Sequence, residues 1–130
     1  MKPSKLRSLV YRWLPLLLWM AAIFVVSGQA STSVPQFGAW DIFIKKAGHF
    51  AAYALFYVLA LRATRNPWAA FALSFVYAVS DELHQTTVVG RNGRFTDVLI
   101  DSAGALTMLL TRSYWLGTRL GRAVVGSYVG

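Results

Sequence analysis

The chain has 130 residues, of which 56% are hydrophobic and 14% are charged, and its mean hydropathy is +0.48. A soluble domain would carry roughly 25% charged residues, so the composition excludes an ordinary soluble domain. It predicts an integral membrane protein with a single domain. The net charge of +8 does not indicate a nucleic-acid partner, because the basic residues flank apolar runs instead of forming a polar face. The absence of cysteine excludes disulfides and thiolate metal sites.

The first apolar run covers residues 13–26 and follows a basic N-terminal segment that includes Lys2 and Arg12. Gly28, Gln29 and Ala30 then form a small-x-small pattern, which is also typical of a signal-peptide cleavage site. Three similar apolar runs follow in the chain. We therefore interpret this run as a retained membrane helix rather than as a removed signal peptide.

The rest of the chain alternates between polar connections and apolar runs. A loop over residues 28–45 precedes a second run at 47–61, and a third helix is expected to begin at Trp68, directly after Pro67. Residues 86–96 contain two glycines and predict a turn or re-entrant loop. A fourth run covers residues 98–110. The pattern predicts an all-α protein in which four transmembrane helices form a small bundle.

The basic residues predict the orientation of this bundle. With a cytoplasmic N-terminus, nine Lys and Arg residues fall on the inner side: Lys2, Lys5, Arg7, Arg12, Arg62, Arg65, Arg112, Arg119 and Arg122. Four fall on the outer side: Lys45, Lys46, Arg91 and Arg94. The positive-inside rule therefore predicts a multi-pass plasma-membrane protein with both termini in the cytoplasm. We expect residues 1–112 to form the membrane domain and 113–130 a basic, aromatic cytoplasmic tail, which is either an interfacial amphipathic helix or poorly ordered.

All five acidic residues and both histidines fall toward the outer ends of the four predicted helices. Helical spacing places Lys46, His49 and Tyr53 on one face, and it likewise groups Asp97 with Asp101. Asp81, His84 and Gln85 share a face of the third helix, from which Glu82 is rotated away. Polar stripes at similar depth in a bilayer are buried against one another, so the sequence predicts one extracytoplasmic polar site.

The residue types at this site indicate proton chemistry beside an anionic phosphate. Catalytic roles are assigned to five residues: His49, Asp81, His84, Asp97 and Asp101. Roles in ligand binding are assigned to seven others: Lys46, Tyr53, Glu82, Gln85, Arg91, Ser27 and Gln29. The histidines and aspartates could also ligate a divalent cation, although no H-E-x-x-H spacing is present. The remaining alternative is a purely structural hydrogen-bonded network that holds the helices together.

Several ordered motifs resemble those of the VanZ-like membrane protein family. They are Trp19-x-x-x-Ile23-Phe24-x-x-Ser27-x-Gln29, Lys46-x-x-His49-Phe50-x-x-Tyr53, Ser80-Asp81-Glu82-x-His84-Gln85, Gly90-Arg91 and Asp97-x-x-x-Asp101-x-x-Gly104. The resemblance covers residues 19–104. Val89 stands where a proline usually precedes the Gly-Arg pair, Lys45 where the residue is often acidic, and Arg94 where it is often small.

This resemblance implies a four-helix membrane protein of the cell envelope, in a family associated with low-level resistance to teicoplanin-type glycopeptides. Together with the polar site, it leads us to expect a ligand that is an anionic envelope lipid or lipid-linked phosphate. The protein would then be a lipid-phosphate hydrolase or transferase. The alternatives are a non-enzymatic binder of an envelope lipid or antibiotic, and a small transporter that works as a homo-oligomer.

Overall fold

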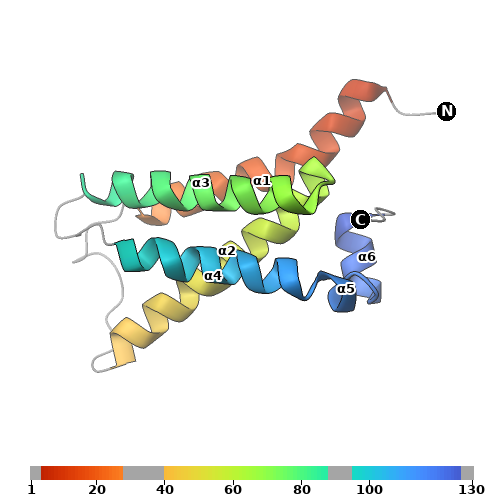
Figure 1. Cartoon of the computed structure of the whole chain (residues 1–130). Helices are drawn as coiled ribbons and strands as arrows, with labels where there is room; N and C mark the ends of the chain where they lie inside the picture. Colours follow the sequence, from red (N-terminus) through yellow and green to blue (C-terminus); the bar gives the residue numbers. More distant parts are fainter. Residues whose placement is uncertain (1–3, 28–39, 88–94, 127–130) are drawn as a thin grey trace.

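The computed structural model describes residues 4–27, 40–87 and 95–126, which are all-helical with no strand in these ranges. The helices, shown in Figure 1, are α1 (Lys5–Ser27), α2 (Asp41–Thr64), α3 (Pro67–Gln85), α4 (Phe95–Leu110), α5 (Arg112–Trp115) and α6 (Arg119–Val125). The predicted all-α class is therefore confirmed.

Within these ranges, one helix is long and apolar enough to cross a membrane, namely α1 over Lys5–Val26. Only Leu16 and Ile23 of this segment are buried against the rest of the chain. Helices α2 and α3 are interrupted by ionisable residues near their ends, and α4 has 16 residues. The topology with four membrane-crossing helices stays a prediction.

Helix α2 is the central element and packs against α1, α3, α4 and α6. In Figure 1 it crosses α3 and α4 obliquely. Helix α1 runs antiparallel to it, because Arg12 reaches the carbonyl of Ala63 whereas Trp19 reaches that of Ala52. Helix α4 runs parallel to α2. As a result, the end of α1, the start of α2, the end of α3 and the start of α4 lie at one end of the bundle.

The core is built around large side chains of α2. Four of them are fully buried: Tyr53, Phe56, Tyr57 and Leu61. The opposing faces of α3 and α4 carry small residues such as Ala70, Ala78 and Ala105, which are also fully buried. Large side chains on one helix therefore pack against small ones on its neighbours, and this arrangement brings the helix axes close together.

A tight turn joins α2 to α3. Arg65 takes the left-handed conformation with φ 55°, and its N–H donates to the carbonyl of Leu61. The side chain of Asn66 then caps α3 by accepting hydrogen bonds from the backbone N–H groups of Trp68 and Ala69, with Pro67 in the first turn. The start of the third helix after Pro67 is thus close to its predicted position.

Two other boundaries differ from the prediction. Helix α2 begins at Asp41, within the predicted loop, and α4 begins at Phe95 rather than at Val98. The prediction followed the apolar runs alone. Lysine is a good helix former, so Lys45 and Lys46 extend α2 beyond its apolar part toward the polar end of the bundle.

The C-terminal segment is helical over α5 and α6 rather than irregular. Helix α6 packs on α2, with Gly121 and Val125 buried. The guanidinium of Arg62 donates a 2.7 Å hydrogen bond to the carbonyl of Val124. The domain boundary predicted near residue 112 stays a prediction, but α6 is docked on the helix that carries the core.

The guanidinium of Arg62 also compensates for a proline within α1. Pro15 has no N–H, so the carbonyl of Tyr11, four residues earlier, loses its helical hydrogen bond. Arg62 supplies a replacement donor to that carbonyl, with an Nη2–O distance of 3.1 Å. One side chain thus links α2 both to the irregular point of α1 and to the end of α6.

We expect Arg62→Met to lower the free energy of unfolding in detergent by about 2 kcal/mol, because it leaves two carbonyl groups without their donor. In a Pro15→Ala background, the N–H at position 15 can bind Tyr11 again. The loss caused by Arg62→Met should then shrink by about 1 kcal/mol. Denaturant titration of the four proteins measures this coupling, and equal losses in both backgrounds would contradict it.

Candidate functional site

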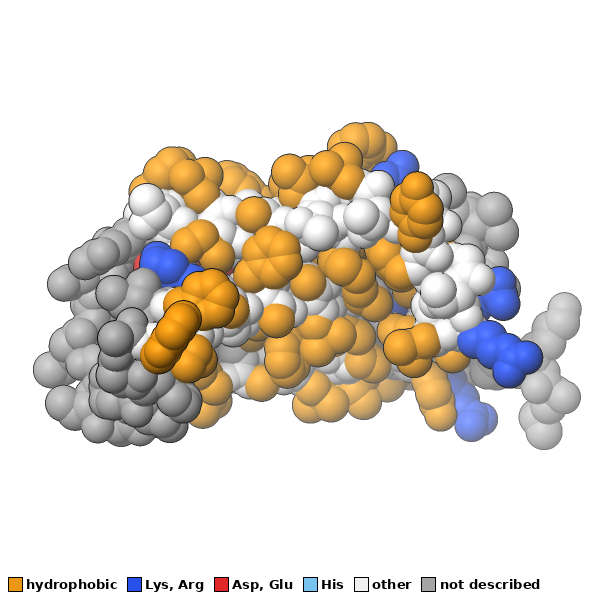
Figure 2. Space-filling model, turned by 90° about the horizontal axis from the view of Figure 1, so that it is seen from below, with side chains coloured by type: hydrophobic (Ala, Val, Ile, Leu, Met, Phe, Trp, Pro, Cys, Tyr) orange, Lys and Arg blue, Asp and Glu red, His pale blue; other side chains and the backbone are white. Residues whose placement is uncertain are grey.

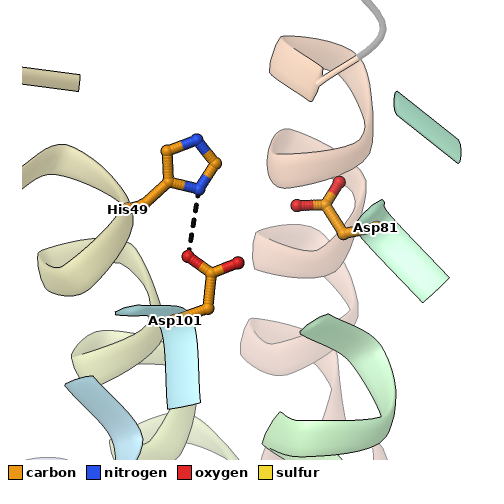
Figure 3. A group of neighbouring side chains, drawn as sticks. All are labelled: His49, Asp81 and Asp101. Atoms are coloured by element: carbon orange, nitrogen blue, oxygen red, sulfur yellow. Dashed lines mark hydrogen bonds and ion pairs between the residues drawn. The ribbon is translucent and has the colours of Figure 1, made fainter. Parts of the chain in front are cut away.

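Three side chains from three helices meet at the end of the bundle where α2 and α4 begin. They are His49 of α2, Asp81 of α3 and Asp101 of α4, which we call the His–Asp–Asp cluster. One ligand atom of each lies within 4.8 Å of the others. Figure 3 shows the His49 ring above Asp101, with the Asp81 carboxylate pointing toward both, and His49 Nδ1 is 3.0 Å from Asp101 Oδ1.

The cluster is largely removed from solvent. Asp101 is 1% exposed and Asp81 is 5% exposed, whereas the His49 side chain keeps 30% of its surface accessible. The imidazole therefore forms the outer edge of the cluster. Since only Nδ1 of His49 has a hydrogen-bond partner among the described residues, Nε2 is the nitrogen available for proton transfer while this hydrogen bond is intact.

The approach of α4 to α2 explains how Asp101 reaches His49. Gly104 follows Asp101 by three residues and lies against the backbone of Phe50 and Ala54 in α2. A side chain at this position would overlap the carbonyl oxygen of Phe50. The missing side chain thus allows the close helix contact that brings the carboxylate to the imidazole.

Tyr53 holds the second carboxylate in place. Its hydroxyl donates to Asp81 Oδ2 at 3.3 Å, and its ring is buried and stacked on Phe56, with centroids 5.6 Å apart. A buried aromatic ring has few alternative rotamers, so the hydroxyl is a fixed donor. The orientation of Asp81 is therefore set by the core of the bundle.

Lys46 and Asp97 form a separate pair one helical turn before His49 and Asp101. Lys46 Nζ is 3.2 Å from Asp97 Oδ1, and the two side chains are 41% and 24% exposed. Pairs this exposed contribute about 0–1 kcal/mol to stability. Lys46 therefore keeps a cation at the rim of the cluster without being locked there.

The charges of the cluster do not balance within the described residues. Asp81 and Asp101 have no Lys or Arg in an ion pair there, and their hydrogen-bond partners are Tyr53 and His49. Even with a protonated imidazole, two carboxylates leave one negative charge in a buried site. An unbalanced buried charge is unfavourable, so a cation or a proton stabilises this arrangement.

His84 lies against α1. Its ring stacks on Phe24 of α1, with centroids 4.2 Å apart and an interplanar angle of 10°. Its Nδ1 is buried and has no hydrogen-bond partner in the described part of the chain. The stacking partner could not be predicted from the sequence, because spacing along α3 does not say which residue of α1 lies beside it.

Glu82 and Gln85 at the end of α3 are both buried, at 7% and 4% exposure. The expectation that Glu82 turns away from the polar face was based on an ideal narrow stripe, and the buried face of α3 is wider than that. The side chain of Ser27, and all of Gln29 and Arg91, lie outside the described residues. The functional roles assigned to the twelve site residues stay predictions.

The fold and the cluster together define an all-helical protein with one very apolar N-terminal helix and a buried histidine–carboxylate site. The sequence profile of the VanZ/LLP1 family matches residues 5–115. The chain therefore belongs to the VanZ/LLP1 family, as the motifs over residues 19–104 predicted. No curated protein and no solved structure matches the chain significantly.

Proposed function

We propose that this VanZ/LLP1-family protein is a multi-pass plasma-membrane protein in which α1 to α4 cross the bilayer. At 1.5 Å per residue, these helices are about 34, 36, 28 and 24 Å long, close to the roughly 30 Å hydrocarbon thickness. Exposed apolar side chains on all four support this topology, including Leu17, Phe43, Val76 and Leu106. Figure 2 shows hydrophobic side chains over the middle of one face, with several Lys and Arg side chains at one end and a smaller basic group at the other.

The charge distribution supports an outward-facing cluster. Every acidic residue of the chain is at or beyond position 81, apart from Asp41 at the start of α2. The opposite end of the bundle carries Arg12, Arg62 and Arg112 without any acidic residue. The positive-inside rule assigns that basic end to the cytoplasm and the His–Asp–Asp cluster to the extracytoplasmic leaflet.

The proposed ligand is the phosphate of an anionic envelope lipid or lipid-linked phosphate. The observation that carries this proposal is the His49 ring, fixed by Asp101 beside a second carboxylate and one helical turn from the half-exposed Lys46–Asp97 pair. An imidazole oriented through one nitrogen transfers protons through the other. Arg91, which follows α3 and precedes α4 in the sequence, stays a second candidate phosphate contact.

In the hydrolytic form of this proposal, water attacks phosphorus and the bond from phosphorus to the lipid oxygen breaks. Asp81 accepts the proton of the attacking water, and protonated His49 gives its Nε2 proton to the leaving lipid oxygen. Lys46 balances charge on the phosphate oxygens. The cluster is complete within one chain, so the proposal needs no second copy.

The test is phosphate release from polyprenyl phosphate, polyprenyl diphosphate and phosphatidic acid by the purified chain in detergent. We expect His49→Gln to reduce turnover by about 100-fold or more, as loss of an acid–base group does. Ser80→Ala is the matched control, since Ser80 is exposed beside Asp81 and bonds only the carbonyl of Tyr77 in its own helix. Saturable binding without product would instead support the non-enzymatic binder, and neither binding nor turnover would overturn the proposal.

A further inference from the structure

We infer that the His–Asp–Asp cluster is a binding site for a divalent cation that accepts mixed nitrogen and oxygen ligands, of the Mn²⁺ or Zn²⁺ type. One imidazole nitrogen and two carboxylate oxygens lie within 4.8 Å of one another. Around an ion with ligand bonds of about 2.1 Å, ligands at right angles are about 3.0 Å apart and opposite ones about 4.2 Å. The 3.0 Å separation of His49 Nδ1 and Asp101 Oδ1 matches the first of these distances.

The charge of the cluster favours the same ion. Asp81 and Asp101 are both more than nine-tenths buried, and neither is paired with Lys or Arg in the described residues. The ammonium group of Lys46, one helical turn from His49, is bonded to Asp97 instead. A divalent cation would neutralise both carboxylates, whereas a proton on His49 neutralises only one.

The surrounding residues support the ligands in the way that metal sites require. Tyr53 donates to Asp81 Oδ2, so the other oxygen of this carboxylate is oriented by a fixed partner. The three ligands come from three different helices, which α2 and Gly104 hold together. The three ligand groups are therefore already gathered at one point of the bundle before an ion binds.

The ion would also explain how an acidic cluster can accept a phosphate, and this point alone rests on the proposed function. Three protein ligands leave further coordination positions for phosphate oxygens. The binding of the ion itself depends only on His49, Asp81 and Asp101. In the ion-bound protein His49 is a ligand, so the proton transfer proposed above belongs to the ion-free protein.

The experiment measures Mn²⁺ binding by electron paramagnetic resonance to the full chain, treated with chelator and free of lipid phosphate. We expect saturable binding of one ion, weakened by about 100-fold in His49→Gln, Asp81→Asn and Asp101→Asn. Tyr53→Phe should weaken it by about tenfold, the effect of losing a group that orients a ligand. Asp41→Asn removes the same charge from α2, about 12 Å along the helix axis from His49, and should change the affinity less than twofold.

A rise in melting temperature of the native chain with Mn²⁺ or Zn²⁺, absent in Asp101→Asn, supports the site by a second measurement. No saturable binding by the native chain at millimolar Mn²⁺ or Zn²⁺, or equal binding by all variants, would overturn the inference. Lipid-phosphate turnover by a chain that binds neither Mn²⁺ nor Zn²⁺ would overturn the inference and keep the proposed function. Mn²⁺ binding without any affinity for a lipid phosphate would support the cation site and overturn the proposed function.

Discussion

Replacing Gly104 by alanine should lower the free energy of unfolding by about 3 kcal/mol, although alanine is the better helix former. The added methyl group would overlap the carbonyl oxygen of Phe50 and press on the backbone nitrogen of Ala54. Both are backbone atoms of α2, so no side chain can rotate away. Helix α4 has to move, and this separates Asp101 from His49.

Gly48→Ala is the matched control for this substitution. It introduces the same methyl group in α2, one residue before His49, where nothing lies within 4 Å of the new atom. Helix propensity should then raise stability by up to about 1 kcal/mol. Denaturant titration of both variants in detergent measures a difference of about 4 kcal/mol. Equal stabilities would mean that α2 and α4 are not in close contact at Gly104.

The close contact at Gly104 was the part of the site least accessible to sequence reasoning. The residue was noticed only as the last position of the motif that begins with Asp97. A small residue one turn after a buried carboxylate is a signal for close helix approach, but it does not say which helix approaches. That information depends on the packing of small α4 residues against the large side chains of α2.

The gathering of polar residues at one end of the bundle was predictable, because it follows from hydrophobic runs and spacing alone. The two cross-helix pairs, Lys46–Asp97 and His49–Asp101, were not predicted, although they follow from the residue spacing on both helices. Lys46 and His49 are three residues apart, and Asp97 and Asp101 are four apart. Because α2 and α4 run parallel, the four side chains form two successive pairs, with the first at the surface and the second buried.

The start of α2 and the burial of Glu82 show two different limits. The loop predicted over residues 28–45 ended where the apolar run approached, whereas α2 already begins at Asp41 and includes Lys45. Glu82 was expected to turn away from Asp81 because of helix rotation, yet both are buried, since the buried face of α3 is wider than one stripe. Functional sites are where local patterns and the final structure are expected to disagree.

The second large effect is expected for Asp101→Asn, which should separate stability from function. Asparagine keeps the size of the side chain and an oxygen that accepts from His49 Nδ1, while it removes one of two buried negative charges. In chelator-treated protein, we expect the free energy of unfolding to stay equal or rise by about 1 kcal/mol. Lipid-phosphate binding or turnover should fall about 100-fold.

A purely structural network predicts the opposite result. If an ion pair between protonated His49 and Asp101 stabilises the fold, removing the carboxylate charge in Asp101→Asn should lower the free energy of unfolding by about 3–5 kcal/mol. Asp97→Asn provides the scale, since its half-exposed pair with Lys46 should change stability by less than about 1 kcal/mol. Retained stability with lost activity means that Asp101 is kept for its charge. A proton-donating His49 or a bound cation requires the negative charge of Asp101. Without it, a protonated His49 would already neutralise Asp81.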